Sequence, residues 1–148
     1  MEALDIVTIV SAGMLIGVEF TISAFVNPIL GRLDRRAEAE ATRLFAQVLG
    51  RVMPFWYGFC LLTLVAESLF RRQTSGFTLL TAASALWAAV IALTLLFLVP
   101  INNRIAKMDA DGYGDELRRQ HRRWDRMHRG RVFLLFVAFV CVLLAISV

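Results

Sequence analysis

Cysteine and proline are scarce in this chain, with two and three copies among 148 residues. Cys60 and Cys141 lie far apart, each within a long apolar run, and neither belongs to a C-x-x-C or C-x-x-H motif. This spacing argues against a zinc site and against a disulfide framework. We therefore expect both cysteines to be small apolar packing residues.

Two kinds of segment are also missing. No stretch rich in glycine, proline or serine separates parts of the chain, so we expect one domain over residues 1–148. The start, Met1 to Asp5, is acidic, whereas a secretory signal peptide begins with positive charge and ends at a small-residue cleavage site. We therefore expect the first apolar run to be retained as a helix.

Apolar residues, by contrast, are abundant. They make up 58% of the chain and give a mean hydropathy of +0.65, whereas a soluble domain is about 45–50% apolar. Since a helix needs about 20 apolar residues to cross a bilayer, we predict four spans, at about 6–30, 52–70, 77–101 and 129–148. Short connections favour antiparallel neighbours. The predicted fold is an all-α integral membrane four-helix bundle with up-down topology. The predicted partner of its outer surface is the lipid bilayer.

Two segments between the spans also have helical patterns. Residues 34–49 are amphipathic, so they form either a helix on the membrane surface or an extension of the second span. Asp109 to Gly114 has turn composition, and from Asp115 the pattern predicts one long helix to the end of the chain. We expect these extensions to project into the cytoplasm.

The positive charge is unevenly distributed. Five arginines lie between the first two runs, two between the second and third, and nine basic residues from Arg104 to Arg131. The positive-inside rule then places both strongly basic loops in the cytoplasm and both termini outside, in a bacterial inner membrane. The net charge of +4 thus serves topology and attraction to anionic lipid, and we do not predict nucleic-acid binding.

Glu19 is an acid in the middle of the first apolar run. An ionised carboxylate at that depth costs about 2.5–3.5 kcal/mol on insertion scales, and such a residue usually faces a bundle interior. Glu19, Ser23 and Asn27 recur every four residues and so share one stripe. We expect Glu19 to face inward and to have a polar partner among Tyr57, Asn102, His128 and Arg131. A purely structural, paired glutamate is the open alternative.

Polar and aromatic residues of all four spans lie near the predicted cytoplasmic ends and are able to converge there. They are Asn27, Trp56, Tyr57, Asn102, Asn103, Trp124, His128 and Arg131. An aromatic belt, helix caps and snorkelling are the structural alternatives for these residues. Glu67 lies near the opposite face, where we expect it to pair with Arg71 at i, i+4.

Three features of the sequence bear on metals and assembly. His121, His128 and Glu19 lie at unmatched depths, and the Glu-x-x-His signature of carboxylate-bridged bundles is missing. We therefore predict no metal site. The Gly13-x-x-x-Gly17 motif allows close approach of helices, either within the bundle or in a homo-oligomer.

Four motifs carry a resemblance to a known family. They are Val18-Glu19-Phe20 to Val26-Asn27-Pro28, Leu49-Gly50-Arg51-Val52-Met53-Pro54-Phe55-Trp56-Tyr57, Val99-Pro100-Ile101-Asn102-Asn103 and Arg123-Trp124-x-x-x-His128-x-x-Arg131. In their order and position the chain resembles the anthrone oxygenase family of small four-helix membrane proteins. The resemblance implies an integral membrane fold and an oxidation of anthrones to anthraquinones by dioxygen with no added cofactor.

Together these observations predict an oxygenase-like or redox-related role on a hydrophobic aromatic or quinone-like substrate. Glu19 or His128 is the predicted catalytic base, and dioxygen is the co-substrate with no cofactor. The predicted substrate-binding residues are Asn27, Trp56, Tyr57, Asn102, Asn103, Trp124 and Arg131. The alternative is a non-enzymatic membrane protein, either a small-solute or proton pathway or a partner subunit. An enzyme needs a cavity of hundreds of Å³ near Glu19 and His128, which a structural protein fills with side chains.

Overall fold

The computed structural model describes residues 2–108 and 114–147, and this part of the chain is helical with no strand. The helices form four rods, each long and apolar enough to cross a membrane. In chain order they are Ala3–Leu30, Arg35–Phe70, Phe77–Ala106 and Asp115–Ser147. The elements are α1 (Ala3–Thr21), η1 (Ile22–Val26), α2 (Asn27–Leu30), α3 (Arg35–Phe70), α4 (Phe77–Leu93), η2 (Thr94–Leu98), α5 (Val99–Ala106) and α6 (Asp115–Ser147). The predicted all-α four-helix membrane bundle is confirmed.

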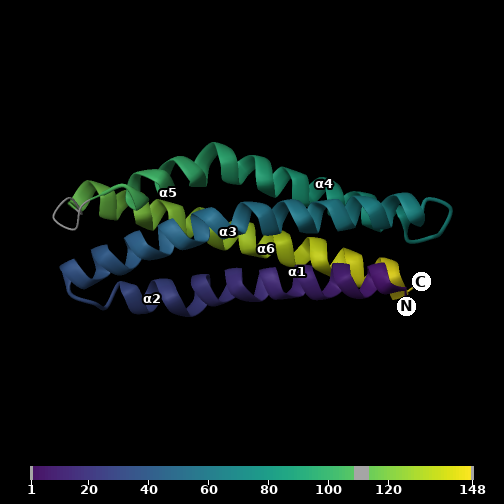
Figure 1. The fold of residues 1–148 in the computed structure, drawn as a ribbon, viewed down its shortest axis with the longest axis horizontal. Coiled ribbons are helices and arrows are strands. Elements are labelled where there is room, and N and C mark those ends of the chain that lie inside the picture. The colour runs from purple at the N-terminus through teal and green to yellow at the C-terminus, as the bar shows by residue number, and fades with distance from the viewer. Residues whose placement is uncertain (1, 109–113, 148) are drawn as a thin grey trace.

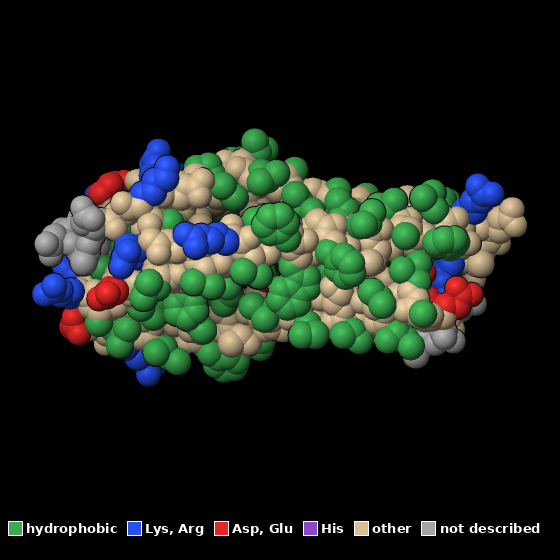
Figure 2. Space-filling view, in the orientation of Figure 1, with side chains coloured by type: hydrophobic (Ala, Val, Ile, Leu, Met, Phe, Trp, Pro, Cys, Tyr) green, Lys and Arg blue, Asp and Glu red, His purple; other side chains and the backbone are tan. Residues whose placement is uncertain are grey.

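The rods run antiparallel along one long axis, with both termini at the same end (Figure 1). α6 packs against both α4 and α1, and α3 packs against α1, α4 and α5. Hydrophobic side chains cover the middle of the molecule, whereas charged side chains gather mostly toward its ends (Figure 2). This distribution is typical of a multi-pass membrane protein, because lipid tails replace water around the middle of the bundle.

α3 is continuous from Arg35 to Phe70, so the amphipathic segment 34–49 is an extension of the second span. The Asp34 carboxylate caps it by accepting hydrogen bonds from the backbone N–H groups of Arg36 and Ala37, both at 3.1 Å. Pro54 lies inside this helix without ending it. At the other extension, α6 begins at Asp115 as predicted, while the predicted turn at 109–114 falls almost wholly outside the described residues.

The first and third rods each contain a π-helical turn, η1 and η2, which ends two residues before a proline. The N–H of Asn27 bonds to the Ile22 carbonyl, and the N–H of Val99 bonds to the Thr94 carbonyl. Proline has no N–H and removes one rung of the helical ladder, and a π-turn shifts the register of the neighbouring bonds. As a result the first rod continues past Pro28 to Leu30, which is also the predicted end of the first span.

Small side chains line much of the buried interior and let the rods approach closely. Ala12, Ala39, Ala46, Ala83, Ala138 and Ala145 are all buried. Gly13 packs within the bundle, where an added Cβ would lie 3.4 Å from the Phe139 ring, but a Cβ on Gly17 would meet nothing within 4 Å. Within one chain, Gly13 of the Gly13-x-x-x-Gly17 motif thus lies at a helix contact, whereas Gly17 does not.

An ion-pair cluster closes the end of the bundle that carries the termini. Arg71 donates to Asp5 at 2.9 Å and pairs with Glu67 at 3.4 Å, which confirms the predicted i, i+4 pair. The hydrogen bond to Asp5 raises the pKa of Arg71 above its ordinary value. Thr8 adds a long contact to Glu67, at 3.5 Å. This cluster ties α1 to the end of α3, at the opposite end from the extensions.

Candidate functional site

Glu19 lies near the end of α1 and is only 1% exposed. The Tyr57 hydroxyl donates to its Oε1 at 2.8 Å, and Arg131 Nη2 donates to its Oε2 at 2.6 Å. The prediction that Glu19 faces inward with polar partners is therefore confirmed. Its charge is balanced by the Arg131 guanidinium in a short, charge-assisted contact.

His128 is fully buried beside this pair. Its Nδ1 lies 2.9 Å from Arg131 Nη2 and 3.2 Å from Glu19 Oε2, and its Nε2 lies 3.2 Å from the Glu19 backbone oxygen. A guanidinium can only donate, so Nδ1 accepts, and the ring proton sits on Nε2 and is donated to the Glu19 carbonyl. His128 is thus assigned as a neutral imidazole that orients Arg131 and the end of α1.

Arg131 connects the site to the other rods. Its Nη1 donates to Thr94 Oγ1 at 3.2 Å, and its guanidinium carbon lies 5.5 Å from the centroid of the Tyr57 ring. Trp87 Nε1 donates to the Tyr57 backbone oxygen at 3.2 Å, and this bond fixes the position of the tyrosine. The network therefore draws one side chain from each of the four rods: Glu19, Tyr57, Thr94 and Arg131.

A pocket of about 370 Å³ lies between α3 and the third rod, with α6 at its base. Its walls are largely apolar, and its polar lining side chains are Tyr57, Thr94, Asn102, Asn103, Trp124 and Arg131. Glu19 and His128 do not line it. Among the residues that the structure describes, the buried carboxylate therefore reaches the pocket only through the Tyr57 hydroxyl and the Arg131 guanidinium.

Arg131 also borders a second pocket, of about 400 Å³, on the other side of the third rod. Its remaining lining residues are apolar or glycine, including Phe97, Met127 and Phe133. Binding sites generally combine an apolar wall with a few convergent polar groups. That description fits the pocket beside Tyr57 and not this one.

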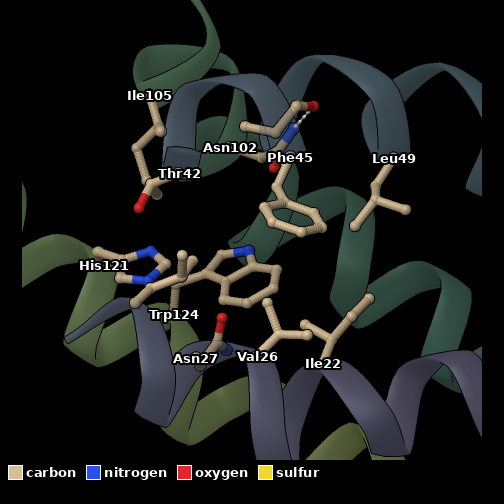
Figure 3. Close-up of a pocket in the computed structure, with 12 residues that line it drawn as sticks. Ile22, Val26, Asn27, Thr42, Phe45, Leu49, Asn102, Ile105, His121 and Trp124 are labelled. Atoms are coloured by element: carbon tan, nitrogen blue, oxygen red, sulfur yellow. Dashed lines mark hydrogen bonds between the residues drawn. The ribbon is translucent and has the colours of Figure 1, made fainter. Parts of the chain in front are cut away.

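A small cavity of about 50 Å³ lies nearer the extensions (Figure 3). Trp124 stands among its lining residues with His121 beside it, and Asn27 and Thr42 supply polar atoms (Figure 3). The Trp124 ring stacks between His121 and His128, with centroid distances of 5.9 and 4.7 Å. The volume is sufficient for water, and Trp124 is shared with the larger pocket.

The seven predicted substrate-binding residues separate into three groups. Tyr57, Asn102, Asn103, Trp124 and Arg131 line the 370 Å³ pocket. Asn27 lines the small cavity and donates to Asp125 at 2.6 Å. Trp56 lines neither space, because its Nε1 donates to Ser11 in the middle of α1.

Asn102 has a further contact with α3. Its Nδ2 donates to the Ala46 carbonyl at 3.1 Å (Figure 3). A Cβ on Gly50 would lie 2.9 Å from the same nitrogen. Glycine at position 50 therefore allows α5 to lie directly against α3.

Sequence reasoning missed four residues that shape the site: Thr94, Trp87, Gly50 and Pro54. Thr94 is a polar residue within an uncharged span, and Pro54 lies inside a helical pattern. Both features are visible in the sequence and could have marked these residues as candidates. Trp87 and Gly50 act through backbone contacts that no local pattern reveals. Among the residues that the structure describes, no three His, Cys, Asp or Glu side chains group so as to hold a metal ion.

Comparison with known proteins bears on this arrangement. A sequence model described as anthrone oxygenase matches residues 42–141, which is more than half of the chain. The chain belongs to the anthrone oxygenase family. In this anthrone oxygenase family member, the matched segment includes every residue that lines the 370 Å³ pocket. It also includes His128, whereas Glu19 precedes the segment. No curated protein and no solved structure matches.

Proposed function

We propose that this protein is a membrane oxygenase that converts the activated methylene of a hydrophobic aromatic ketone, of the anthrone type, into a carbonyl with dioxygen. One observation carries the proposal. A largely apolar pocket of about 370 Å³ is bordered by Tyr57 and Arg131, which both contact the buried Glu19 carboxylate. Family membership supports the same class of reaction.

The first step is proton removal. The substrate methylene gives its proton to the Tyr57 oxygen while the Tyr57 proton passes to Glu19 Oε1, 2.8 Å away. The negative charge thereby moves from Glu19 to the substrate enolate. Arg131 contacts Glu19 and borders the pocket, so it faces the charge both before and after transfer.

The second step uses dioxygen as co-substrate, with no cofactor. The carbanion forms a C–O bond to dioxygen, and the resulting peroxide takes the proton held by Glu19 through Tyr57. Loss of the second C–H proton then breaks the O–O bond and forms the new carbonyl, and the departing hydroxide takes that proton as water. One CH₂ and one O₂ become one C=O and one H₂O.

The remaining residues of the site orient these groups. Trp124, Asn102 and Asn103 hold the aromatic ligand, because they line the pocket. His128 is a positioning residue, since it contacts both Glu19 and Arg131 without lining the pocket. Asn27 supports α6 through Asp125, and Trp56 fixes α3 against α1.

The protein is proposed to act in a bacterial inner membrane. The basic extensions then lie in the cytoplasm and both termini lie outside. The pocket sits between the rods, where a hydrophobic substrate arrives from the lipid.

Turnover in lipid nanodiscs tests the proposal. Wild-type protein should convert anthrone to anthraquinone with one O₂ consumed per product, faster than empty nanodiscs. Leu95→Trp should lower the rate several-fold because Leu95 lines the pocket, whereas Leu96→Trp, which changes the next residue outside it, should not. Equal rates with wild-type protein and with empty nanodiscs reject the proposed function.

A further inference from the structure

The second pocket, of about 400 Å³, shares two lining residues with the pocket beside Tyr57. They are Leu98, which ends the π-turn η2, and Arg131 of α6. A side chain that lines two spaces separates them, so at these positions the two pockets are one side chain apart. The third rod thus has the pocket beside Tyr57 on its α3 side and the second pocket on its α6 side.

The lining of the second pocket suits a ligand that makes no hydrogen bonds. Among the described residues that line it, Arg131 alone is polar. The Nη1 and Nη2 atoms of Arg131 already donate to Thr94 and Glu19, and its Nε is buried. An apolar cavity of this kind offers water too few partners, stays dry and takes up small apolar molecules such as xenon.

The second pocket also borders the outer surface of the bundle. Leu93, Phe97 and Phe133 line it, and all three are exposed. In a membrane these side chains lie against lipid chains. Dioxygen is small, apolar and more soluble in hydrocarbon than in water, so it enters such a pocket from the lipid without losing hydrogen bonds.

We propose that the second pocket is the dioxygen site of this protein, in which gas from the lipid collects before it passes Leu98 to the substrate. This inference rests on the proposed function, since it gives the co-substrate of that reaction a place of its own. The aromatic substrate occupies the pocket beside Tyr57 and covers its opening between α3 and the third rod. Dioxygen then arrives from the α6 side and meets the carbanion without displacing the substrate.

Methionine positions allow dioxygen to be located without any turnover. Met127 lines the second pocket, Met53 lines the pocket beside Tyr57, and Met14 is 59% exposed on the outer surface. Dissolved dioxygen is paramagnetic and speeds the relaxation of nearby methyl groups. In nanodiscs with methyl-labelled methionine, oxygen should therefore enhance relaxation more at Met127 than at Met14, which reports oxygen in the lipid. An enhancement at Met127 equal to or below that at Met14 means that lipid chains fill the pocket, and it rejects the proposal.

Gly130 is the position at which the pocket can be filled. It lines the second pocket, and a Cβ there would meet nothing within 4 Å. Gly130→Leu should lower the enhancement at Met127 several-fold and leave the Met53 signal in place, which shows that the pocket beside Tyr57 is intact. Gly58→Leu is the matched control, because Gly58 is also a helix glycine with no neighbour within 4 Å of its Cβ and lines neither pocket.

Oxygen kinetics with anthrone test the route. Gly130→Leu should lower kcat/KM for dioxygen several-fold and leave KM for anthrone unchanged, because only the path of the gas is blocked. Leu93→Trp is a second filling variant at an exposed lining position and should act alike, whereas Gly58→Leu and Leu96→Trp should not. Turnover with an unchanged kcat/KM for dioxygen in both filling variants rejects the route alone. A wild type without anthrone turnover rejects the proposed function and this route together.

Discussion

At the scale of single residues, the Glu19–Arg131 pair governs both stability and chemistry. Two opposite charges are buried together at 2.6 Å, while Tyr57 also donates to the carboxylate and Thr94 also accepts from the guanidinium. Removing one charge leaves the other uncompensated in an apolar interior, which costs more than the pair itself contributes. The pair is therefore a structural requirement whatever its catalytic role.

This pair gives the first prediction. Glu19→Gln should lower the free energy of unfolding by about 3–5 kcal/mol, because Arg131 then lies buried without a counter-charge. Adding Arg131→Met should restore part of that loss, since both charges are then gone. Unfolding by SDS titration in mixed micelles measures both effects. A double variant less stable than Glu19→Gln alone would show that the pairing is not what matters.

Much of this site was predictable from the residues themselves. An acid in an apolar run needs a partner, and Tyr57, His128 and Arg131 were among the candidates because each lies near the predicted cytoplasmic end of its span. The expectation that His128 and Glu19 lie at unmatched depths was wrong, since His128 Nδ1 lies 3.2 Å from Glu19 Oε2. Which of these side chains line the pocket was not predictable. It depends on the rotation of each helix about its axis, which excludes Glu19 and His128 from the lining and turns Trp56 toward Ser11.

At the scale of helices, glycine positions decide where the rods approach most closely. A Cβ at Gly76 would lie 2.5 Å from the Ala145 carbonyl oxygen of α6, and backbone cannot move aside as a side-chain tip can. At Gly58, in contrast, a Cβ would meet nothing within 4 Å. The two glycines therefore have different roles.

The matched pair Gly76→Ala and Gly58→Ala gives the second prediction. Gly76→Ala should destabilise the protein, by about 1–3 kcal/mol as in other overpacked sites. Gly58→Ala should be neutral or stabilising by up to about 1 kcal/mol, because alanine has the higher helix propensity. Thermal unfolding of the two proteins in the same detergent checks this. Equal unfolding temperatures would show that α6 does not lie against the start of α4.

The sequence predicted where the helices lie, but it did not predict the π-turns within them. Apolar runs near 20 residues predict spans, and the 3.6-residue period predicts the inward face of α6. Prolines indicate a disturbance without fixing its form. Pro28 and Pro100 follow π-turns inside continuous rods, whereas Pro54 lies in an α-helix with no π-turn. The sequence around each proline does not by itself predict which of these two forms is adopted.

At the scale of the whole molecule, the charge distribution is the basis of the proposed membrane orientation. Both termini lie at one end, and the basic extensions lie at the other (Figure 1). In the proposed orientation, which follows the positive-inside rule, the extensions lie in the cytoplasm. The Gly13-x-x-x-Gly17 prediction of a homo-oligomer remains a prediction, and a Cβ on Gly17 would meet nothing within 4 Å.

Orientation gives the third prediction. In a variant with Cys60 and Cys141 replaced by alanine, a cysteine appended beyond either terminus should react with a membrane-impermeant maleimide in intact cells. A cysteine at Arg36, on the extension of α3, should react only after the cells are permeabilised. The reverse pattern would place the basic extensions outside and overturn the proposed topology.

The most direct test of the central claim is the rate of dioxygen consumption with anthrone by Tyr57→Phe protein. Among the contacts that the structure describes, the Tyr57 hydroxyl is the only group that can pass a proton from the pocket to Glu19. Loss of this hydroxyl should therefore lower kcat by about a hundredfold or more. Phe55→Leu, a substitution at an exposed position of α3 outside the pocket, should leave kcat near the wild-type value. A Tyr57→Phe protein that folds normally and consumes dioxygen at the wild-type rate would contradict the claim that this network performs the chemistry.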